Sequence, residues 1–294
     1  MTLPIRNGRI RLSQGQIFWR EVGQGVPIVL LHDTWSDGGE WLAVVDLLAE
    51  QYHCLMPDLL GFGESERPRL HYSVALEVDC LAEWLEALRL RRVSLVGVGV
   101  GAWVAASFAL KHEEKVDGLV LLAPEGVKVV GAAQRWQGGR SLLSRVPLAR
   151  WLLNLVAPVA KLLGWRSVLK LQERVRLWRR SPAASQILFN RRPVEIQAEY
   201  IGGASIDPTS GSTSGPTSGS TGTHGQHLSW LKAPLLLLQG DAESSLIAAQ
   251  IRAYTDAPRA QVQTLPGQDL LQTAPEVVAR SIHAFMRNNT PSNG

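Results

Sequence analysis

One stretch of the chain, residues 93–104, constrains the fold more than any other. It reads Val-Ser-Leu-Val-Gly-Val-Gly-Val-Gly-Ala-Trp-Val, an apolar strand that runs through three alternate glycines into a helix. Continuously apolar strands are typical of a parallel sheet that is covered on both faces. The stretch therefore predicts a strand, a tight turn and a helix at the centre of an α/β sheet.

The turn has the shape of a nucleophile elbow, in which Gly-x-Ser-x-Gly presents a reactive serine on a strained backbone. Here Gly99 takes the position of the serine. The strained conformation costs a residue with a side chain about 1–3 kcal/mol, whereas glycine adopts it freely. A chain that no longer uses the hydroxyl can shed this strain, so we expect an elbow without a nucleophile.

The rest of the chain alternates predicted strands with predicted helices. Polar–apolar alternation indicates a hairpin, and apolar runs indicate further strands, over residues 8–12, 16–20, 27–31, 53–56, 93–98, 116–122, 234–241 and 260–265. Apolar residues at helical spacing, preceded in one case by Ser73 as a cap, indicate helices over residues 41–50, 74–88, 100–111, 246–254 and 275–286. This pattern is typical of an α/β fold with a doubly wound, mostly parallel sheet, in which loops at the carboxyl ends of the strands carry the chemistry.

The length of 294 residues suits one α/β core with an insertion. The core is expected to comprise residues 1–124 and 230–288, interrupted by a basic helical cap (125–201) and a flexible Ser/Thr/Gly-rich linker (202–229), with a polar tail at 289–294. The linker has almost nothing to bury and cannot offset the entropy of ordering.

The cap region is strongly basic, since residues 126–206 contain 14 Lys and Arg against 3 Asp and Glu. Its apolar, Trp-bearing stripe resembles a pair of interfacial helices. We expect the stripe to pack on the core as an ordinary lid with the arginines facing water, and an anionic membrane surface is the alternative. If the cap meets an anionic membrane surface, the candidate contacts are Arg145, Arg150, Arg174, Arg176, Arg179 and Arg180. We expect no nucleic acid partner, and the sequence leaves open whether the chain has a protein partner.

Hydropathy and cysteine content lead to expectations about where the protein is found and about its thiols. The sequence has no apolar run of the ~20 residues that cross a bilayer and no cleavable leader, which predicts a cytoplasmic protein with peripheral membrane attachment as an alternative. Cys54 and Cys80 are expected to be buried free thiols, and neither a metal nor a cofactor is expected.

Five landmarks in order resemble the α/β-hydrolase superfamily. They are His32-Asp33 after a buried strand, the segment from Pro57 to Ser65, the glycine elbow, Gly240-Asp241-Ala242-Glu243, and Pro266-Gly267 ahead of Ala274-Pro275-Glu276. The resemblance implies a hydrolase fold and positions for a nucleophile, a base and an acid. The His-Asp pair and the elbow also resemble the N-myc downstream-regulated family, which keeps the fold without the triad.

The chain departs from the hydrolase pattern at each of these positions. Gly99 vacates the nucleophile position, and the loop after the last strand has Gln268 and Asp269 where the base histidine is expected. The acid position has Glu243, or Asp241 by a shift, and Glu125 ends another strand as a further acid. Asp33 replaces the usual glycine, and its carboxylate beside the Val100 amide would oppose a developing oxyanion.

The chain is therefore predicted to be a non-hydrolytic hydrolase-fold protein, a pseudoenzyme that binds an apolar small molecule, a lipid or a partner. The residues expected around its pocket are His32, Asp33, Thr34, Trp35, Gly99, Val100, Glu125 and Glu243. The alternative is an atypical hydrolase or lyase that uses His32 and nearby acids, including Asp58 and Asp269, for acid–base work. Against that alternative, His32 and Asp58 are expected to satisfy loop backbone groups, and Asp269 to cap a helix or face solvent.

Overall fold

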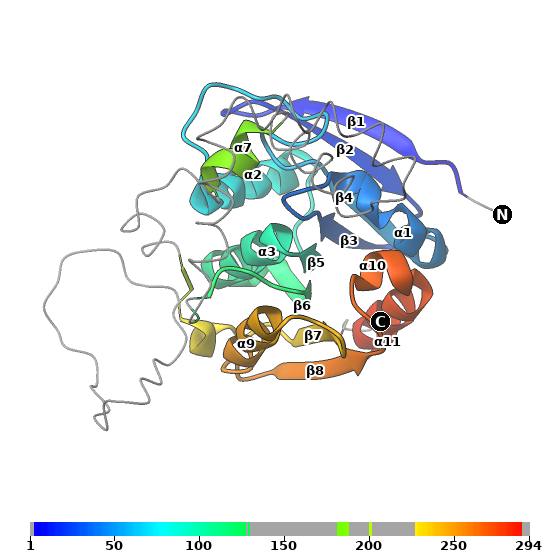
Figure 1. Cartoon of the computed structure of the whole chain (residues 1–294). Helices are drawn as coiled ribbons and strands as arrows, with labels where there is room; N and C mark the ends of the chain where they lie inside the picture. The colour runs from blue at the N-terminus through cyan, green and yellow to red at the C-terminus, as the bar shows by residue number, and fades with distance from the viewer. Residues whose placement is uncertain (1–2, 128, 130–180, 188–199, 202–226, 290–294) are drawn as a thin grey trace, which may run out of the picture.

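The computed structural model describes residues 3–127, 129, 181–187, 200–201 and 227–289, and an eight-stranded sheet runs through the middle of this part (Figure 1). The strand order is β1-β2-β4-β3-β5-β6-β7-β8. The strands are β1 (Arg6–Arg11), β2 (Gln16–Val22), β3 (Val26–Leu31), β4 (Tyr52–Pro57), β5 (Val93–Val98), β6 (Val116–Leu122), β7 (Leu235–Gly240) and β8 (Ala260–Leu265). Strand β2 pairs antiparallel with β1 and β4. The remaining neighbours in the sheet, from β4 through β8, all pair in parallel. The predicted mostly parallel, doubly wound sheet is confirmed.

Helices cover both faces of the sheet. Those on one face are α2 (Val74–Ala87), α3 (Val100–Lys111) and α9 (Ser245–Tyr254), and those on the other are α1 (Leu42–Leu48) and α11 (Pro275–Asn289) (Figure 1). The central strand β3 shows why both are needed, because Val29 and Leu31 pack with α2 and α3 while Ile28 and Leu30 pack with α1 and α11. Its continuous apolar sequence is therefore buried from both sides.

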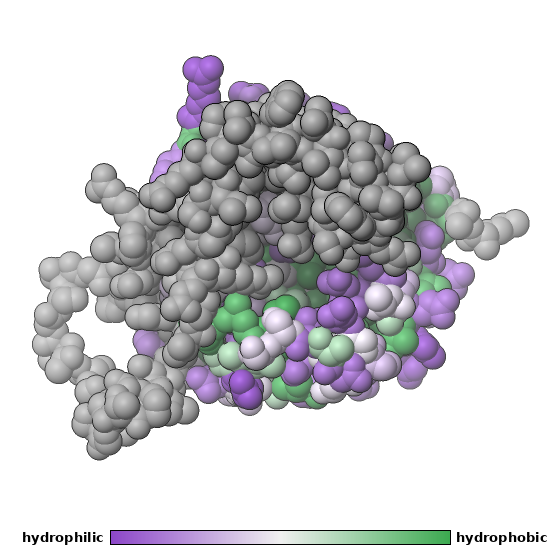
Figure 2. Space-filling view, in the orientation of Figure 1, coloured by the Kyte–Doolittle hydropathy of each residue, from purple (hydrophilic) through white to green (hydrophobic). Residues whose placement is uncertain are grey.

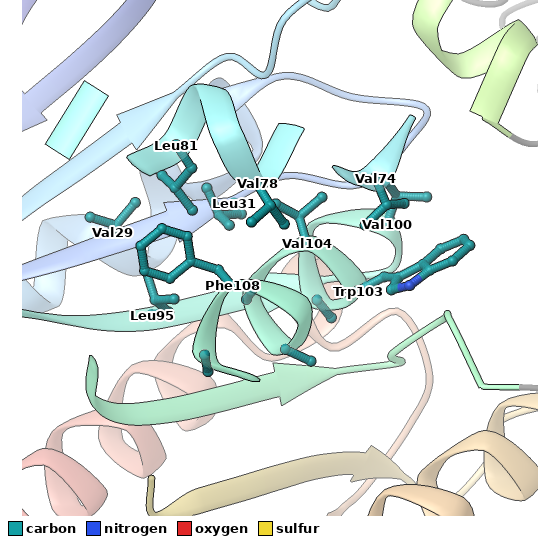
Figure 3. Packing of buried hydrophobic residues seen from close by; sticks show 14 of the residues in the cluster. Val29, Leu31, Val74, Val78, Leu81, Leu95, Val100, Trp103, Val104 and Phe108 are labelled. Carbon is teal, nitrogen blue, oxygen red and sulfur yellow. The ribbon is translucent and has the colours of Figure 1, made fainter. Parts of the chain in front are cut away.

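Helix α3 packs against both α2 and the sheet, where Val104 and Phe108 lie close to neighbours such as Val78 and Leu95 (Figure 3). Its residues from Val100 to Ala109 are all buried. A helix that is buried all round has no polar stripe, which explains why the sequence here is apolar without helical periodicity. The packing fixes the amino end of α3, and with it the turn that precedes the helix.

Several short elements refine the predicted boundaries. A 3₁₀-helix, η1 (Gly38–Trp41), precedes α1, and α10 (Leu270–Thr273) forms in the loop after β8. Further 3₁₀-helices are η2 (Glu113–Lys115) and η4 (Leu228–Trp230). Leu228 of η4 falls within the predicted linker and is completely buried, and residues 202–226 of that linker lie outside the described residues. Helix α11 also continues to Asn289, three residues beyond its expected end near Met286.

Of the predicted cap, the structure describes a few residues, including the short helix α7 (Pro182–Ser185). The Oγ of Ser181 donates a 2.9 Å hydrogen bond to the Gly61 carbonyl, and Val127 forms a β-bridge with Ile201. The six arginines proposed to meet a membrane lie outside the described residues. None of the described helices is long and apolar enough to cross a bilayer. Cys54 and Cys80 are buried free thiols, as expected.

Candidate ligand site at the Gly99 elbow

The elbow is formed where β5 passes into α3. Gly99 has φ 56° and ψ −118°, a combination that residues with a side chain rarely adopt, and α3 begins at the next residue. Its backbone is held on three sides: its N–H donates to the Leu122 carbonyl, and its carbonyl accepts from the N–H groups of Trp103 and Glu125, each at 3.2 Å. The strained turn that the sequence predicts is therefore present, with glycine in the strained position.

The flanking glycines have a different role, which is to let helix and sheet approach closely. A Cβ on Gly97 would lie 2.6 Å from the Gly101 carbonyl oxygen, and a Cβ on Gly101 would overlap the carbonyl oxygens of Leu31 and His32. Neither glycine has a positive φ. The three alternate glycines thus serve two purposes. Gly99 allows the strained backbone conformation of the turn, and Gly97 and Gly101 allow α3 to approach the sheet closely.

The carboxylate of Asp33 fills the place that a side chain at position 99 would occupy. A Cβ built on Gly99 would overlap both Oδ1 and Cγ of Asp33. The same Oδ1 accepts a 3.2 Å hydrogen bond from the Val100 N–H, the first free amide of α3. The amino end of a helix favours a negative charge, so the carboxylate is well placed to remain there. A group of this chain itself therefore occupies the position next to the Val100 amide.

The loop that carries Asp33 is held by Glu40, a residue that sequence reasoning missed. Its Oε1 accepts a 2.6 Å hydrogen bond from the Asp33 N–H. Burial, reinforced by the nearby Asp33 carboxylate, raises the pKa of Glu40 to about 8. The neighbouring Thr34 is 3% exposed, and its Oγ1 has no partner among the described residues. The sequence signal for Glu40 is an acid between Gly39 and Trp41, immediately before the predicted helix.

His32 is fully buried and both of its ring nitrogens contact backbone groups. Its Nε2 accepts from the Leu59 N–H at 3.0 Å, which places the proton on Nδ1, where it donates to the Asp33 carbonyl at 2.7 Å. The ring thereby joins the Asp33 loop to the loop after β4. An imidazole with both nitrogens engaged is not available as a general base, so the structure supports the structural role expected for His32.

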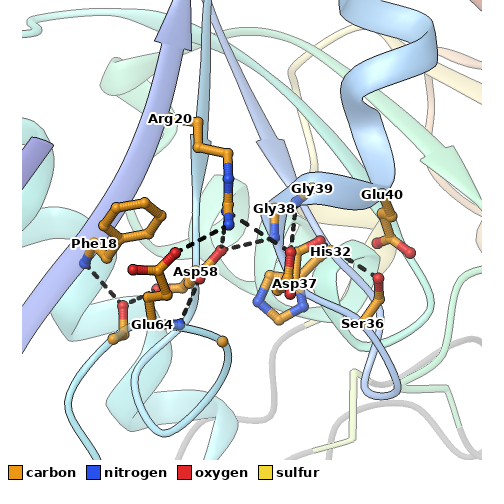
Figure 4. Close-up of polar contacts among 12 residues, drawn as sticks. Phe18, Arg20, His32, Ser36, Asp37, Gly38, Gly39, Glu40, Asp58 and Glu64 are labelled. Carbon is orange, nitrogen blue, oxygen red and sulfur yellow. Dashed lines mark hydrogen bonds and ion pairs between the residues drawn. The ribbon is translucent and has the colours of Figure 1, made fainter. Parts of the chain in front are cut away.

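Asp58 is likewise a structural residue (Figure 4). Its carboxylate accepts hydrogen bonds from the N–H groups of Gly38 and Glu64, at 2.8 and 2.7 Å, and from Arg20 at 3.0 Å. Arg20 also lies within 4 Å of carboxylate oxygens of Asp37 and Glu64. This buried charge is therefore paired and fully hydrogen-bonded, and it fixes the two loops that flank His32.

Sequence comparison identifies the family to which this architecture belongs. A model of the alpha/beta hydrolase family matches residues 28–281. The chain belongs to the alpha/beta hydrolase family. The matched range includes β3, the elbow, both acid positions and the loop after β8.

Curated relatives of this hydrolase-family chain match over about two fifths of its sequence. They include a 2-hydroxy-6-oxo-2,4-heptadienoate hydrolase of Pseudomonas putida, 36% identical over 41% of this chain and 45% of that protein. Another is the mouse 1-acylglycerol-3-phosphate O-acyltransferase ABHD5, 35% identical over 40% of this chain and 36% of that protein. The matches thus cover less than half the length of these relatives.

Solved structures of hydrolases match the fold over nearly the whole chain. Est816, described as an N-acyl homoserine lactone degrading enzyme, has a TM-score of 0.67 at 20% identity, covering 95% of this chain and 100% of its own. A membrane phospholipase A has a TM-score of 0.64 at 22% identity, covering 98% and 87%. At these identities the similarity establishes the fold alone.

The structure describes the residues expected at the acid and base positions. Glu243 is partly buried after β7, and Glu125 is buried after β6, where its carbonyl accepts a 2.7 Å hydrogen bond from the Tyr254 hydroxyl. Gln268 and Asp269 are exposed, and Asp269 lies at the start of α10 with a left-handed backbone and no side-chain capping bond. Among the described residues no cluster of three His, Cys, Asp or Glu side chains could hold a metal ion.

Aromatic residues add a feature that the sequence analysis did not single out. Trp103, one turn into α3 from the elbow, stacks on Tyr200 with ring centroids 5.4 Å apart and planes at 7°. Trp103 also packs against Gly126, where any Cβ would overlap the indole ring. Of the residues expected around the site, Asp33, Gly99 and Val100 are in direct contact, and Glu125 joins them through its backbone.

Proposed function

We propose that this chain is a non-hydrolytic member of its family, which binds an apolar small molecule or lipid beside the elbow. The observation that carries the proposal is the Asp33 carboxylate, which overlaps the side-chain space of residue 99 and accepts the Val100 N–H. In a hydrolase this space holds the nucleophile, and this amide stabilises the oxyanion. A carboxylate there repels a developing negative charge.

Two further features support the absence of acyl transfer. The hydroxyl of a serine is inert at neutral pH without a base, and the two positions for that base hold Gln268 and Asp269. The buried imidazole nearest the elbow, His32, uses both nitrogens for backbone groups. The resemblance of the elbow to the N-myc downstream-regulated family agrees with this proposal.

The class of ligand is proposed from the relatives. The acyltransferase relative is named for an acylglycerol phosphate, and the hydrolase relative for an unsaturated oxo acid, both with extended carbon chains. An apolar site that does not turn over its ligand is expected to retain it through purification. A lipid or another apolar molecule is therefore the proposed occupant.

The proposal predicts both an inert elbow and a retained ligand. Purified protein should not be labelled by a fluorophosphonate probe and should hydrolyse short p-nitrophenyl esters no faster than buffer, with a serine hydrolase treated in parallel as the positive control. Mass spectrometry of an organic extract should recover an apolar molecule in near-stoichiometric amount. Ester turnover by a protein that carries no ligand would contradict the proposal.

The second candidate is an atypical enzyme in which Asp33 itself acts, because its carboxylate stands where a nucleophile side chain would be. In that case any turnover found in the same assay should be abolished by Asp33→Asn, which keeps the shape of the side chain and removes its charge. Glu64→Gln, which alters an exposed acid away from the elbow, should leave that turnover intact.

A further inference from the structure

The two edges of the sheet differ in how they are protected. At one end, β1 carries Arg6, Arg9 and Arg11, and two of these form ion pairs with Glu64 and Glu66 at 2.5 Å. Charged side chains on an edge strand oppose pairing with another chain. The β1 edge is therefore protected in the manner usual for a monomeric sheet.

The edge at β8 has none of this protection. Its sequence, Ala-Gln-Val-Gln-Thr-Leu, contains no charged residue, no proline and no glycine. Its four central residues are all exposed, so neither face of the strand is covered, and Val262 is 46% exposed. Among the described residues, β7 is the single strand that pairs with it (Figure 1). Unprotected edges of this kind are ready to accept another strand.

The backbone of β8 shows which groups are free to pair. The carbonyls of Arg259 and Leu265 point to β7, because they accept the N–H groups of Leu235 and Asp241 at 3.2 and 2.9 Å. Backbone direction alternates along a strand, so Gln261 and Gln263 also face β7, and Val262 and Thr264 face outward. Two residues thus present both an N–H and a carbonyl on the open edge.

We propose that the β8 edge is the dimer interface of this protein, with β8 of a second copy paired to it antiparallel. Two identical strands that meet across a twofold axis must run antiparallel, and each offers the same edge to the other. The result is one continuous sheet of sixteen strands, eight from each copy. Because the strand is uncharged, the pairing brings no like charges together along its length.

Charges beyond the ends of the strand complement one another in this arrangement. Arg259 is exposed at the start of β8, beside the exposed Asp256, while Asp241 and Asp269 are exposed near its end. An antiparallel partner brings its own acidic end next to Arg259, and this occurs twice in the dimer. A parallel arrangement would instead place like ends together. The surface around β8 mixes hydrophilic and hydrophobic residues (Figure 2), which suits an interface held by strand pairing.

Sedimentation velocity over a range of concentrations tests the proposal with the full chain. The unaltered protein should form dimers, and Val262→Lys should weaken dimerisation about tenfold or more, since it places two lysines on adjoining strands across the axis. Asn7→Lys, an equivalent change on the exposed β1 edge, should leave the dimer unchanged. A monomer at all concentrations, or a dimer that Val262→Lys does not weaken, would overturn the proposal.

Charge reversal tests the direction of pairing independently of folding. Arg259→Asp alone should weaken the dimer, and Arg259→Asp combined with Asp269→Arg should restore it in part. Arg259→Asp should keep the thermal unfolding midpoint of the unaltered chain, because its side chain is exposed. Asp269→Arg should lower the midpoint slightly, because arginine tolerates the left-handed backbone at that position less well than aspartate. If the double variant dimerises less than Arg259→Asp alone, the strands do not pair antiparallel. Neither test depends on the ligand or on the chemistry proposed for the elbow.

Discussion

The carboxylate of Asp33 fills the space beside the Cα of Gly99 where a side chain at position 99 would lie. The two positions therefore cannot both place a side chain there. The strained backbone of Gly99 alone would cost a substituted residue about 1–3 kcal/mol. Because the added Cβ would also overlap the Asp33 carboxylate, a substitution has to move Asp33 from the Val100 amide. The two residues are therefore energetically coupled.

This coupling predicts the behaviour of Gly99→Ser. The variant should lose about 2–5 kcal/mol of unfolding free energy, combining backbone strain with the overlap, and should gain no esterase activity. Adding Asp33→Ala should recover about 1–3 kcal/mol of that loss, although Asp33→Ala by itself should be slightly destabilising. Urea unfolding of the four proteins in this cycle measures the coupling. A coupling near zero would show that the Asp33 carboxylate does not occupy this space.

At the level of single residues, the sequence predicted the elbow strain at Gly99 and the backbone roles of His32 and Asp58. The position of the Asp33 carboxylate beside the Val100 amide was implied by the resemblance to the hydrolase superfamily, and the structure shows the hydrogen bond between them. Glu40 and the Trp103–Tyr200 stack could not be predicted. Both depend on how a side chain is directed within a loop or across an insertion, which periodicity does not encode.

Among the elements, α2 offers a direct test of its predicted cap. The Oγ of Ser73 accepts the Leu76 N–H at 2.9 Å while its backbone is extended, as an N-cap requires. Ser73→Ala should reduce the unfolding free energy by about 1 kcal/mol. The matched control is Ser244→Ala on α9, where the corresponding bond to the Ile247 N–H is 3.4 Å long and exposed, so the loss should be smaller. Equal losses measured by urea unfolding would argue against the Ser73 bond.

The elements that periodicity predicted well were the long and strongly patterned ones. Strands β3, β5 and β6 are buried on both faces and read as apolar runs, and α11 has a clear amphipathic pattern. The short helices η1 and α10 were missed, since four residues hold too little pattern to distinguish a helical turn from a loop. Leu228 falls near the end of the predicted linker, yet it packs in the core and is completely buried.

For the molecule as a whole, two buried carboxyl groups make stability depend on pH. Burial raises the pKa of Glu77 to about 8, as it does for Glu40, and Glu77 lines a small cavity between α2 and the sheet. In the unfolded chain both groups ionise near 4.5, their ordinary value. Between these values the folded protein holds protons that the unfolded chain has released. Stability should therefore fall as pH rises from about 4.5 to 8.

Glu77→Gln separates this effect from other titrations. Glutamine can still accept the Leu60 N–H, which now donates to Glu77 Oε2 at 3.0 Å, but it carries no proton to release. The variant should gain about 1–4 kcal/mol relative to the unaltered protein between pH 5 and pH 8. Glu86→Gln, on the exposed face of the same helix, should show no such gain. Denaturation midpoints at the two pH values give the comparison, and parallel pH profiles for all three proteins would contradict the assignment.

The overlap between a side chain at position 99 and the Asp33 carboxylate also limits which substitutions the chain can accept one at a time. A serine introduced at position 99 would meet the Asp33 carboxylate, and a glycine introduced at position 33 would leave position 99 without a side chain. The first change is expected to destabilise the fold, and neither change supplies a histidine at Gln268 or Asp269. On the proposed function, a single substitution could therefore not turn this chain into a serine hydrolase.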